Sequence, residues 1–320
     1  MKSVFNSFAA IFAAVSISIT ILFTSGCGAD SNGFFYPALG LSEGRILVTN
    51  ATAAPAAHTV TMYDLNGRFI SVVKDLSAAA TVMRGMAIYD PLHIIVSTDT
   101  PDQLSKLNIF TGEFTDFSAN ALLTGNIYDV VGLGGQDYVV AESNTIERFS
   151  GNTRIPTAGN PYINTTLGAC VLSTPRGMTK NSSGHLIVAS NVNNRLLRYN
   201  VSSTTSSCIE SNASFGANLP IPVVAHSDGN VYFGTQTNDA IYSLPENFVA
   251  GDVATIVLNA NASINNPVAM ATLPNGNLLV ASDGIDTIIE MTTTGTVVNP
   301  SFIKNAFTST VTAILVIRPQ

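Results

Sequence analysis

One short phrase recurs six times in this chain: two or three apolar residues, then a valine (once a phenylalanine), then a small residue. The marker residues of the phrase are Val48, Val96, Val140, Val188, Phe233 and Val280. Successive markers stand 44 to 48 residues apart. A period in the forties built from β-forming residues is typical of small sheets repeated around an axis. The repeat therefore predicts an all-β fold, a six-bladed β-propeller.

Each unit holds more than the marker strand. A polar turn precedes that strand, and in four units it places glycine four residues before the marker, as at Gly184 and Gly276. Such a turn indicates a hairpin, with an apolar strand upstream that suits the innermost position of a blade. Two more β-type runs follow, such as 195–199 in the fourth unit. Four antiparallel strands make one blade, so we expect residues 34–320 to form a single propeller domain.

The fourth unit carries a more specific pattern, with PRGM at 175–178, GHLIVAS at 184–190 and NNRL at 193–196. The sixth unit repeats much of it. The pattern resembles the NHL-repeat family, whose unit runs through Pro-x-Gly, then Asp-Gly-x-Ile/Leu-Tyr-Val-Ala-Asp, then Asn-Asn-Arg-Ile. Ser190 and Ser282 stand where the family has aspartate. The resemblance supports the propeller, but its motifs specify blades and not chemistry.

The repeat leaves open how the ring closes. Two terminal segments, Tyr36–Leu41 and Thr310–Ile317, each suit the innermost position of the first blade. We expect the N-terminal segment to take that position. The C-terminal strand would then pair with the first or last blade, because an unpaired apolar strand promotes aggregation.

Residues 1–27 resemble a targeting segment and are set apart from the fold. Lys2 is followed by an apolar stretch, 9–23, that is shorter than a spanning helix requires. The stretch is followed by TSGC at 24–27, which resembles a bacterial lipobox with Thr24 where leucine is usual. The resemblance implies a lipid on Cys27. The alternative is an ordinary cleaved signal peptide with Cys27 as an incidental thiol.

The same resemblance gives an expected location. Aspartate directly after the lipidated cysteine retains many lipoproteins of Gram-negative bacteria in the inner membrane, and this chain has Gly28 there. Gly28 therefore favours the outer membrane, with the domain facing the periplasm or the cell surface. Residues 28–33 form a short tether, so we expect the membrane to be one partner, through the N-terminal lipid.

The chain has three cysteines, an odd number for an exported protein. If Cys27 carries lipid, Cys170 and Cys208 remain as a pair, and an oxidising compartment permits a disulfide between them. There is no Cys-x-x-Cys motif, so this disulfide would be structural and not redox-active.

Charge excludes one class of function. The formal net charge is −7, charged residues make up 11% of the chain, and no cluster of Lys and Arg occurs. Nucleic-acid binding needs cations that neutralise phosphates, so we expect no nucleic-acid partner. There is also no Gly-x-Ser-x-Gly elbow and no phosphate-binding loop before a helix, and nothing in the sequence implies a cofactor.

Candidate ligand-binding residues lie at one repeat position, twelve residues before each marker. That position holds Tyr36, Arg84, Tyr128, Arg176, Ile221 and Val268, and Asp129 comes one residue after Tyr128. If these side chains meet at one mouth of the central channel, the two arginines can hold an anionic group bidentately. The alternative is that Arg84 and Arg176 pair with Asp129 or face solvent.

A metal centre is the next possibility. Propeller enzymes of the gluconolactonase and paraoxonase type hold calcium at the channel floor through Glu, Asn and Asp side chains, and a hard cation needs several convergent oxygens. Here Asp129 is the one carboxylate near the start of an inner strand, so we expect no metal site. The four histidines fall at unrelated repeat positions and suit structural roles; they are His58, His93, His185 and His226.

Two function hypotheses remain. The sequence favours a lipid-anchored propeller that binds a protein, peptide or glycan on one face, because propellers present variable loops on a repeated scaffold. The alternative is an enzyme acting at the channel mouth, either a calcium-dependent lactonase or esterase or a lyase.

Overall fold

A computed structural model describes residues 43–50, 58–77, 82–99, 101–117, 123, 125–155, 162–164, 166–167, 170–201, 208–211, 218–304 and 310–319. All of these residues belong to one compact unit, Phe35–Gln320. They form strands and turns, apart from short 3-10 turns such as Asp283–Ile285. Within them, no helix has the length and apolar character needed to cross a membrane.

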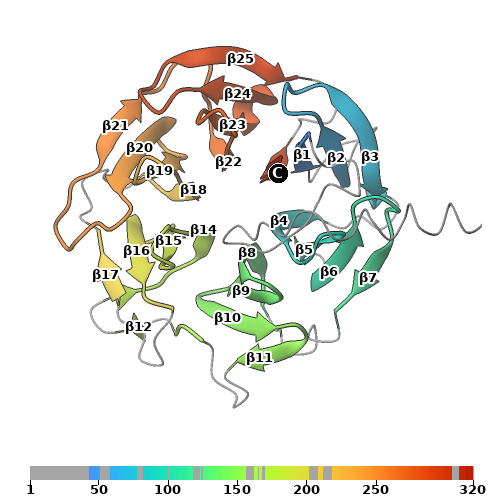
Figure 1. Cartoon of the computed structure of the whole chain (residues 1–320). Coiled ribbons are helices and arrows are strands. Elements are labelled where there is room, and N and C mark those ends of the chain that lie inside the picture. The colour runs from blue at the N-terminus through green and yellow to red at the C-terminus, as the bar shows by residue number, and fades with distance from the viewer. Residues whose placement is uncertain are drawn as a thin grey trace, which may run out of the picture. The chain divides into compact units, whose positions relative to one another are not determined.

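Six four-stranded antiparallel sheets surround a central axis (Figure 1), which confirms the predicted fold. From the innermost strand outward, the first blade consists of β26 (Val311–Ile317), β1 (Arg45–Asn50), β2 (Thr59–Tyr63) and β3 (Phe69–Asp75). The second blade consists of β4 (Met83–Ile88), β5 (His93–Asp99), β6 (Asp102–Asn108) and β7 (Phe114–Asp116). The third blade consists of β8 (Ile127–Gly134), β9 (Asp137–Glu142), β10 (Thr145–Ser150) and β11 (Thr153–Ile155). The fourth blade consists of β14 (Pro175–Lys180), β15 (Leu186–Ser190), β16 (Arg195–Tyr199) and β17 (Cys208–Glu210). The fifth blade consists of β18 (Pro220–Ala225), β19 (Asn230–Thr235), β20 (Ala240–Pro245) and β21 (Thr255–Leu258). The sixth blade consists of β22 (Pro267–Thr272), β23 (Leu278–Ser282), β24 (Thr287–Met291) and β25 (Val297–Ile303).

The marker phrase is the second strand of each blade, and both of its faces are buried. Successive side chains of a strand point to opposite faces, and here each face meets a different neighbouring blade. On β15, Val188 packs with Val139 of the third blade, while Ile187 packs with Val231 of the fifth. The phrase is therefore apolar throughout instead of alternating with polar residues.

Ser190 and Ser282, which stand where the NHL pattern has aspartate, each accept a backbone hydrogen bond. Ser190 Oγ accepts from the backbone N–H of Ser173 at 2.9 Å, and Ser282 Oγ accepts from that of Asn265 at 2.7 Å. Both donors lie just before the innermost strand of the same blade. A hydroxyl oxygen thus satisfies a backbone donor, and the departure from the NHL pattern leaves the blade intact.

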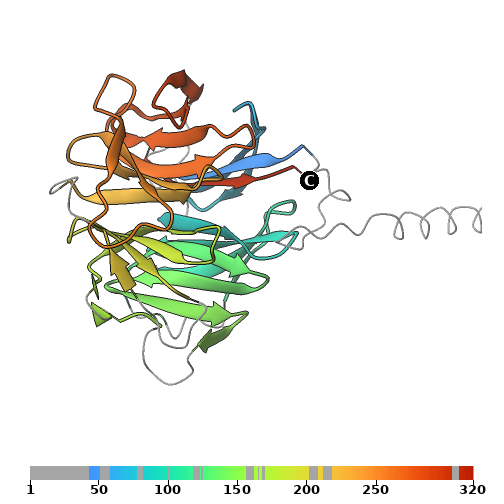
Figure 2. The ribbon, with the colours of Figure 1, turned by 60° about the vertical axis from the view of Figure 1, so that its left-hand side comes forward.

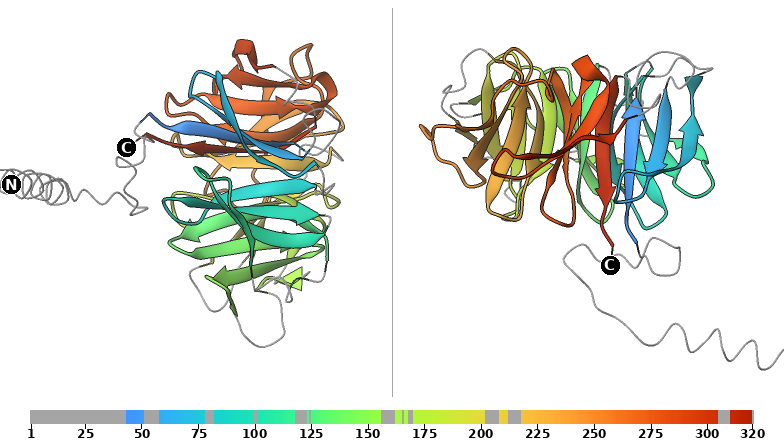
Figure 3. Two further views of the ribbon diagram at one scale, coloured as in Figure 1. Left: turned by 90° about the vertical axis from the view of Figure 1, so that its right-hand side faces the viewer. Right: turned by 90° about the horizontal axis from the view of Figure 1, so that it is seen from above.

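The C-terminal strand closes the ring, so the expectation of an N-terminal innermost strand is wrong. β26 pairs antiparallel with β1, with Ile314 opposite Val48, and Figures 2 and 3 show the two strands side by side. Val311, Ile314 and Ile317 are all buried, so β26 supplies the apolar contacts that the innermost position requires. Tyr36–Leu41 lies outside the described residues.

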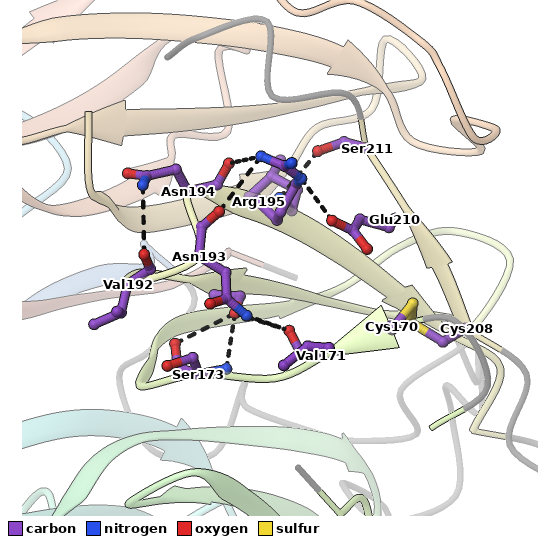
Figure 4. Close-up of polar contacts among 12 residues, drawn as sticks. Cys170, Val171, Ser173, Val192, Asn193, Asn194, Arg195, Cys208, Glu210 and Ser211 are labelled. Atoms are coloured by element: carbon purple, nitrogen blue, oxygen red, sulfur yellow. Dashed lines mark hydrogen bonds and ion pairs between the residues drawn. A yellow bond between two sulfur atoms is a disulfide. The ribbon is translucent and has the colours of Figure 1, made fainter. Parts of the chain in front are cut away.

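A small hairpin lies between the third and fourth blades. It consists of β12 (Thr166–Leu167) and β13 (Cys170–Val171). A disulfide joins Cys170 to Cys208 on β17, with 6.0 Å between the two Cα atoms. Asn193 Nδ2 donates to the carbonyl oxygen of Val171 at 2.7 Å. Figure 4 shows both links between the hairpin and the fourth blade.

Candidate ligand site at the channel mouth

Every innermost strand carries a β-bulge at the same repeat position. On β4, for example, Met83 lies opposite Thr98 and Met86 opposite Val96, so one extra residue is inserted. The same shift occurs near the start of β8, β14, β18, β22 and β26. A bulge redirects a side chain out of the regular alternation. The propeller therefore has one such bulge near the start of each of its six inner strands.

The bulges fall at the same position of all six inner strands around the central axis, and we call the six residues that they hold the bulge ring. Its members, in blade order, are Thr312, Arg84, Tyr128, Arg176, Ile221 and Val268. All six are partly exposed, whereas the residues before them on their strands, such as Met83 and Pro175, are buried. Five members are the residues that the repeat frame predicted for one position. Thr312 takes the place expected for Tyr36, because β26 closes the ring.

The next position along each inner strand points toward the following blade and is usually small. A Cβ on Gly85 would lie 2.6 Å from Asp129 Oδ1, and one on Gly177 would lie 2.1 Å from the carbonyl oxygen of Ile221. Neither glycine has room for a side chain, so close approach of the blades accounts for both. Asp129 is the one charged residue at this position.

Asp129 bridges the third and fourth blades instead of joining the arginines. Its Oδ1 accepts from the backbone N–H of Val130 at 2.8 Å, and its Oδ2 accepts from that of Met178 at 2.7 Å. Burial raises the pKa of Asp129 to about 7, although both hydrogen bonds act to lower it. Among the described residues it forms no ion pair. The structure thus gives Asp129 a bracing position between blades.

Arg84 has an anionic partner within its own blade. Its Nε donates to Asp99 Oδ2 at 3.0 Å, and its terminal nitrogen also pairs with that oxygen. Asp99 is the last residue of β5, three residues after the marker Val96. The ion pair fixes the direction of Arg84 at the channel mouth.

Arg176 has an aromatic partner instead. Its guanidinium carbon lies 4.2 Å from the centre of the Tyr128 ring, a cation–π contact across the boundary between β8 and β14. In the part of the chain that the structure describes, no carboxylate pairs with Arg176. Burial lowers the pKa of Arg176, as does the nearby positive charge of Arg84, while Tyr128 and Asp99 act to raise it. Arg176 is thus a partly buried cation for which the described residues supply no carboxylate partner.

The rest of the bulge ring is uncharged. Ile221 and Val268 are aliphatic, and Thr312 shares a hydrogen bond of 2.8 Å with the hydroxyl of Thr49. The ring therefore has a cationic half, formed by Arg84, Tyr128 and Arg176, and a mostly apolar half. Such a surface complements a group that carries negative charge beside an apolar portion.

Of the other candidates, His93 and His226 contact the surrounding blades and turns. No group of three or more His, Cys, Asp or Glu side chains that could hold a metal ion occurs among the described residues. His226 Nε2 lies 2.9 Å from the carbonyl oxygen of Gly276 in the sixth blade, and His93 contacts Asp90 in its own turn. Cys27 lies outside the described residues.

Comparisons with known proteins define the fold class. No family model and no curated protein matches the chain, and the NHL resemblance stays a prediction. The chain is similar to solved structures of virginiamycin B lyase from Staphylococcus aureus (17% identity, 70% of each chain, TM-score 0.54) and of a nidogen/laminin complex (12% identity, 87% of this chain and 99% of that one, TM-score 0.58). It is also similar to YCF48 bound to D1 peptide (11% identity, 80% and 78%, TM-score 0.50). At these identities the likeness establishes the β-propeller fold alone.

Proposed function

We propose that the protein is an exported, lipid-anchored binding module that holds a protein, peptide or glycan ligand at the bulge ring. The observation that carries the proposal is Arg176, a partly exposed cation without a carboxylate partner among the described residues, at a channel mouth where Arg84 and Tyr128 also lie. The remainder of the described chain repeats a blade design. Two structures of similar fold are a nidogen/laminin complex and YCF48 bound to D1 peptide, and these names agree with a macromolecular partner.

Binding is tested on peptide and glycan arrays with the full-length protein purified in detergent. The double variant Arg84→Gln/Arg176→Gln should lose at least about tenfold in signal on the ligands that the unaltered protein selects, because it removes both cations. Arg68→Gln, at an exposed arginine in the turn between β2 and β3, should retain the signal. Equal signals from the double variant and the unaltered protein would contradict the proposed site.

The lipid anchor is tested separately in a Gram-negative host. Cys27→Ser should abolish incorporation of labelled palmitate and release the protein from membranes. Gly28→Asp should keep the lipid but move the protein from outer-membrane to inner-membrane fractions. If Cys27→Ser still incorporates palmitate, or if the unaltered protein never does, the anchor is not at Cys27.

The second candidate is an enzyme, because virginiamycin B lyase is among the structures of similar fold. In this alternative the channel mouth catalyses either the calcium-dependent hydrolysis of a lactone or ester, or the elimination reaction of a lyase. Turnover of simple lactones or esters by the purified protein, lost in Arg84→Gln/Arg176→Gln and dependent on calcium, would favour the lactonase or esterase. Turnover of virginiamycin B or quinupristin by the purified protein would favour a lyase.

A further inference from the structure

The two arginines of the bulge ring differ in how their charges are compensated. Arg84 already pairs with Asp99, whereas Arg176 has the face of Tyr128 and, among the described residues, no carboxylate. A partly buried cation without an anion is costly to desolvate. An anionic ligand group would therefore pair with Arg176 more readily than with Arg84, because Asp99 already accepts from Arg84.

The charges that act directly on Arg176 favour a ligand group with a single negative charge. The charged groups that act on Arg176 are Arg84 and Asp99, and together with Arg176 they leave one net positive charge. Asp102, beyond Asp99 in the same hairpin, accepts from the backbone N–H of Ile127 at 3.3 Å. One uncompensated positive charge matches a carboxylate better than a phosphate, which carries close to two charges at neutral pH.

Tyr128 makes Arg176 suitable for a planar acceptor. The contact between the guanidinium carbon of Arg176 and the face of the Tyr128 ring, at 4.2 Å, does not need the N–H donors of the guanidinium. A carboxylate can then accept two parallel hydrogen bonds from the fork. Tyr128 thus positions Arg176 and leaves its donors available, which a carboxylate partner would not do.

The other half of the bulge ring distinguishes peptides from glycans. Ile221 and Val268 follow Arg176 in blade order and present aliphatic side chains that are partly exposed. Sugar hydroxyls facing these residues would lose hydrogen bonds to water without replacement. An aliphatic side chain would instead gain from leaving water.

We propose that the bulge ring binds an acidic peptide segment in which one carboxylate side chain lies next to an aliphatic side chain. The carboxylate pairs with the fork of Arg176, and the aliphatic side chain contacts Ile221 and Val268. This inference rests on the proposed function and names its ligand class.

The test uses isothermal titration of the full-length protein in detergent with four probes. They are the blocked peptide acetyl-Leu-Glu-Leu-Gly-amide, its Gln analogue, its phosphoserine analogue and trigalacturonate. We expect the Glu peptide to bind at least about tenfold more tightly than the Gln and galacturonate probes, and more tightly than the phosphoserine peptide. Carbon-13 shifts of the Ile221 and Val268 methyl groups should move on titration with the Glu peptide.

Variants separate the roles of the residues. Arg176→Gln should weaken the Glu peptide by about tenfold or more, and Arg176→Lys should weaken it by an intermediate factor because the charge stays but the fork is lost. Asp99→Asn should shift preference toward the phosphoserine peptide, because it raises the local charge by one. Arg68→Gln is the matched control, and thermal melts confirm that each variant is folded.

Other outcomes would overturn the inference in distinguishable ways. Tighter binding of trigalacturonate would replace the peptide with an acidic glycan, and tighter binding of the phosphoserine peptide by the unaltered protein would refute the charge count. If no probe binds while the arrays still show ligands lost in Arg84→Gln/Arg176→Gln, the proposed function stands and the ligand class is wrong. If the arrays also show none, both fail.

Discussion

Asp129 and Arg176 are charged residues near the start of neighbouring inner strands. They occupy adjacent repeat positions and yet have different roles. Arg176 occupies the bulge position, where the side chain is partly exposed at the channel and rests on Tyr128. Asp129 occupies the next position, which points into the following blade and meets backbone N–H donors of Val130 and Met178. At the residue scale, the bulge decides whether a charged side chain stays partly exposed, as at Arg176, or braces two blades, as at Asp129.

The bracing role of Asp129 predicts a pH-dependent stability. Its pKa is about 7 in the folded chain, above the ordinary value of 3.8, because burial disfavours the carboxylate. The folded state therefore holds this proton more tightly than the unfolded state, so the free energy of unfolding should fall as pH rises from 5 to 7 and then level off. We expect a loss of about 1 to 3 kcal/mol from this group, since one pKa unit corresponds to about 1.4 kcal/mol.

Urea denaturation at pH 5, 6, 7 and 8 measures this effect. The side-chain amide in Asp129→Asn cannot ionise, so the free energy of unfolding of this variant should fall less between pH 5 and pH 7 than that of the unaltered protein. Asp116→Asn, at an exposed carboxylate on β7, should keep the slope of the unaltered protein. If Asp129→Asn and the unaltered protein have the same pH profile, Asp129 is not the group that titrates.

At the scale of elements, the β12–β13 hairpin depends on covalent attachment. Each of its strands has only two residues, too few for a hairpin to be stable alone. The disulfide from Cys170 to Cys208 and the hydrogen bond from Asn193 to Val171 connect it to the fourth blade (Figure 4). The disulfide therefore supplies what strand pairing cannot.

Removing that disulfide should destabilise the protein measurably. The two cysteines are 38 residues apart, and closing a loop of this length contributes about 3 to 4 kcal/mol in the chain-entropy model. Cys170→Ser/Cys208→Ser should lower the free energy of guanidinium unfolding by about that amount. A reducing agent should lower the unaltered protein to the same value and leave the double variant unchanged. A double variant as stable as the unaltered protein would contradict this account.

The elements could be predicted from the sequence far better than the contacts between them. The run 195–199 is β16 with the same bounds, and the markers lie on the second strand of each blade. Periodicity predicts a strand and its faces but not its register, so it could not predict the bulges. Pro175 and Pro267, at the start of two inner strands, were the one local signal for them. The pairing of Arg84 with Asp99, and the direction of Asp129, depend on that register and could not be predicted.

At the scale of the whole molecule, the sequence does not determine which terminal segment forms the innermost strand of the first blade. Two apolar segments of similar length satisfy the same local pattern, and the choice depends on contacts between residues more than 260 positions apart, such as Thr49 with Thr312. In the structure β26 joins the C-terminal end of the chain to β1 and packs against the sixth blade. Closure by a single strand makes the integrity of the ring depend on seven residues.

Deletion of residues 311–320 should therefore remove cooperative folding of the entire propeller. Val311, Ile314 and Ile317 are at most 9% exposed, and burying each such side chain contributes about 1.5 to 3 kcal/mol. Their sum rivals the total stability of about 5 to 15 kcal/mol that is typical of proteins. The truncated chain should lack a sharp thermal transition by circular dichroism, and a synthetic peptide covering 310–320 should restore it. Val298→Ala, at a side chain on β25 that is 52% exposed, should change the transition little. A truncated chain that melts as sharply as the unaltered protein would show that another segment closes the ring.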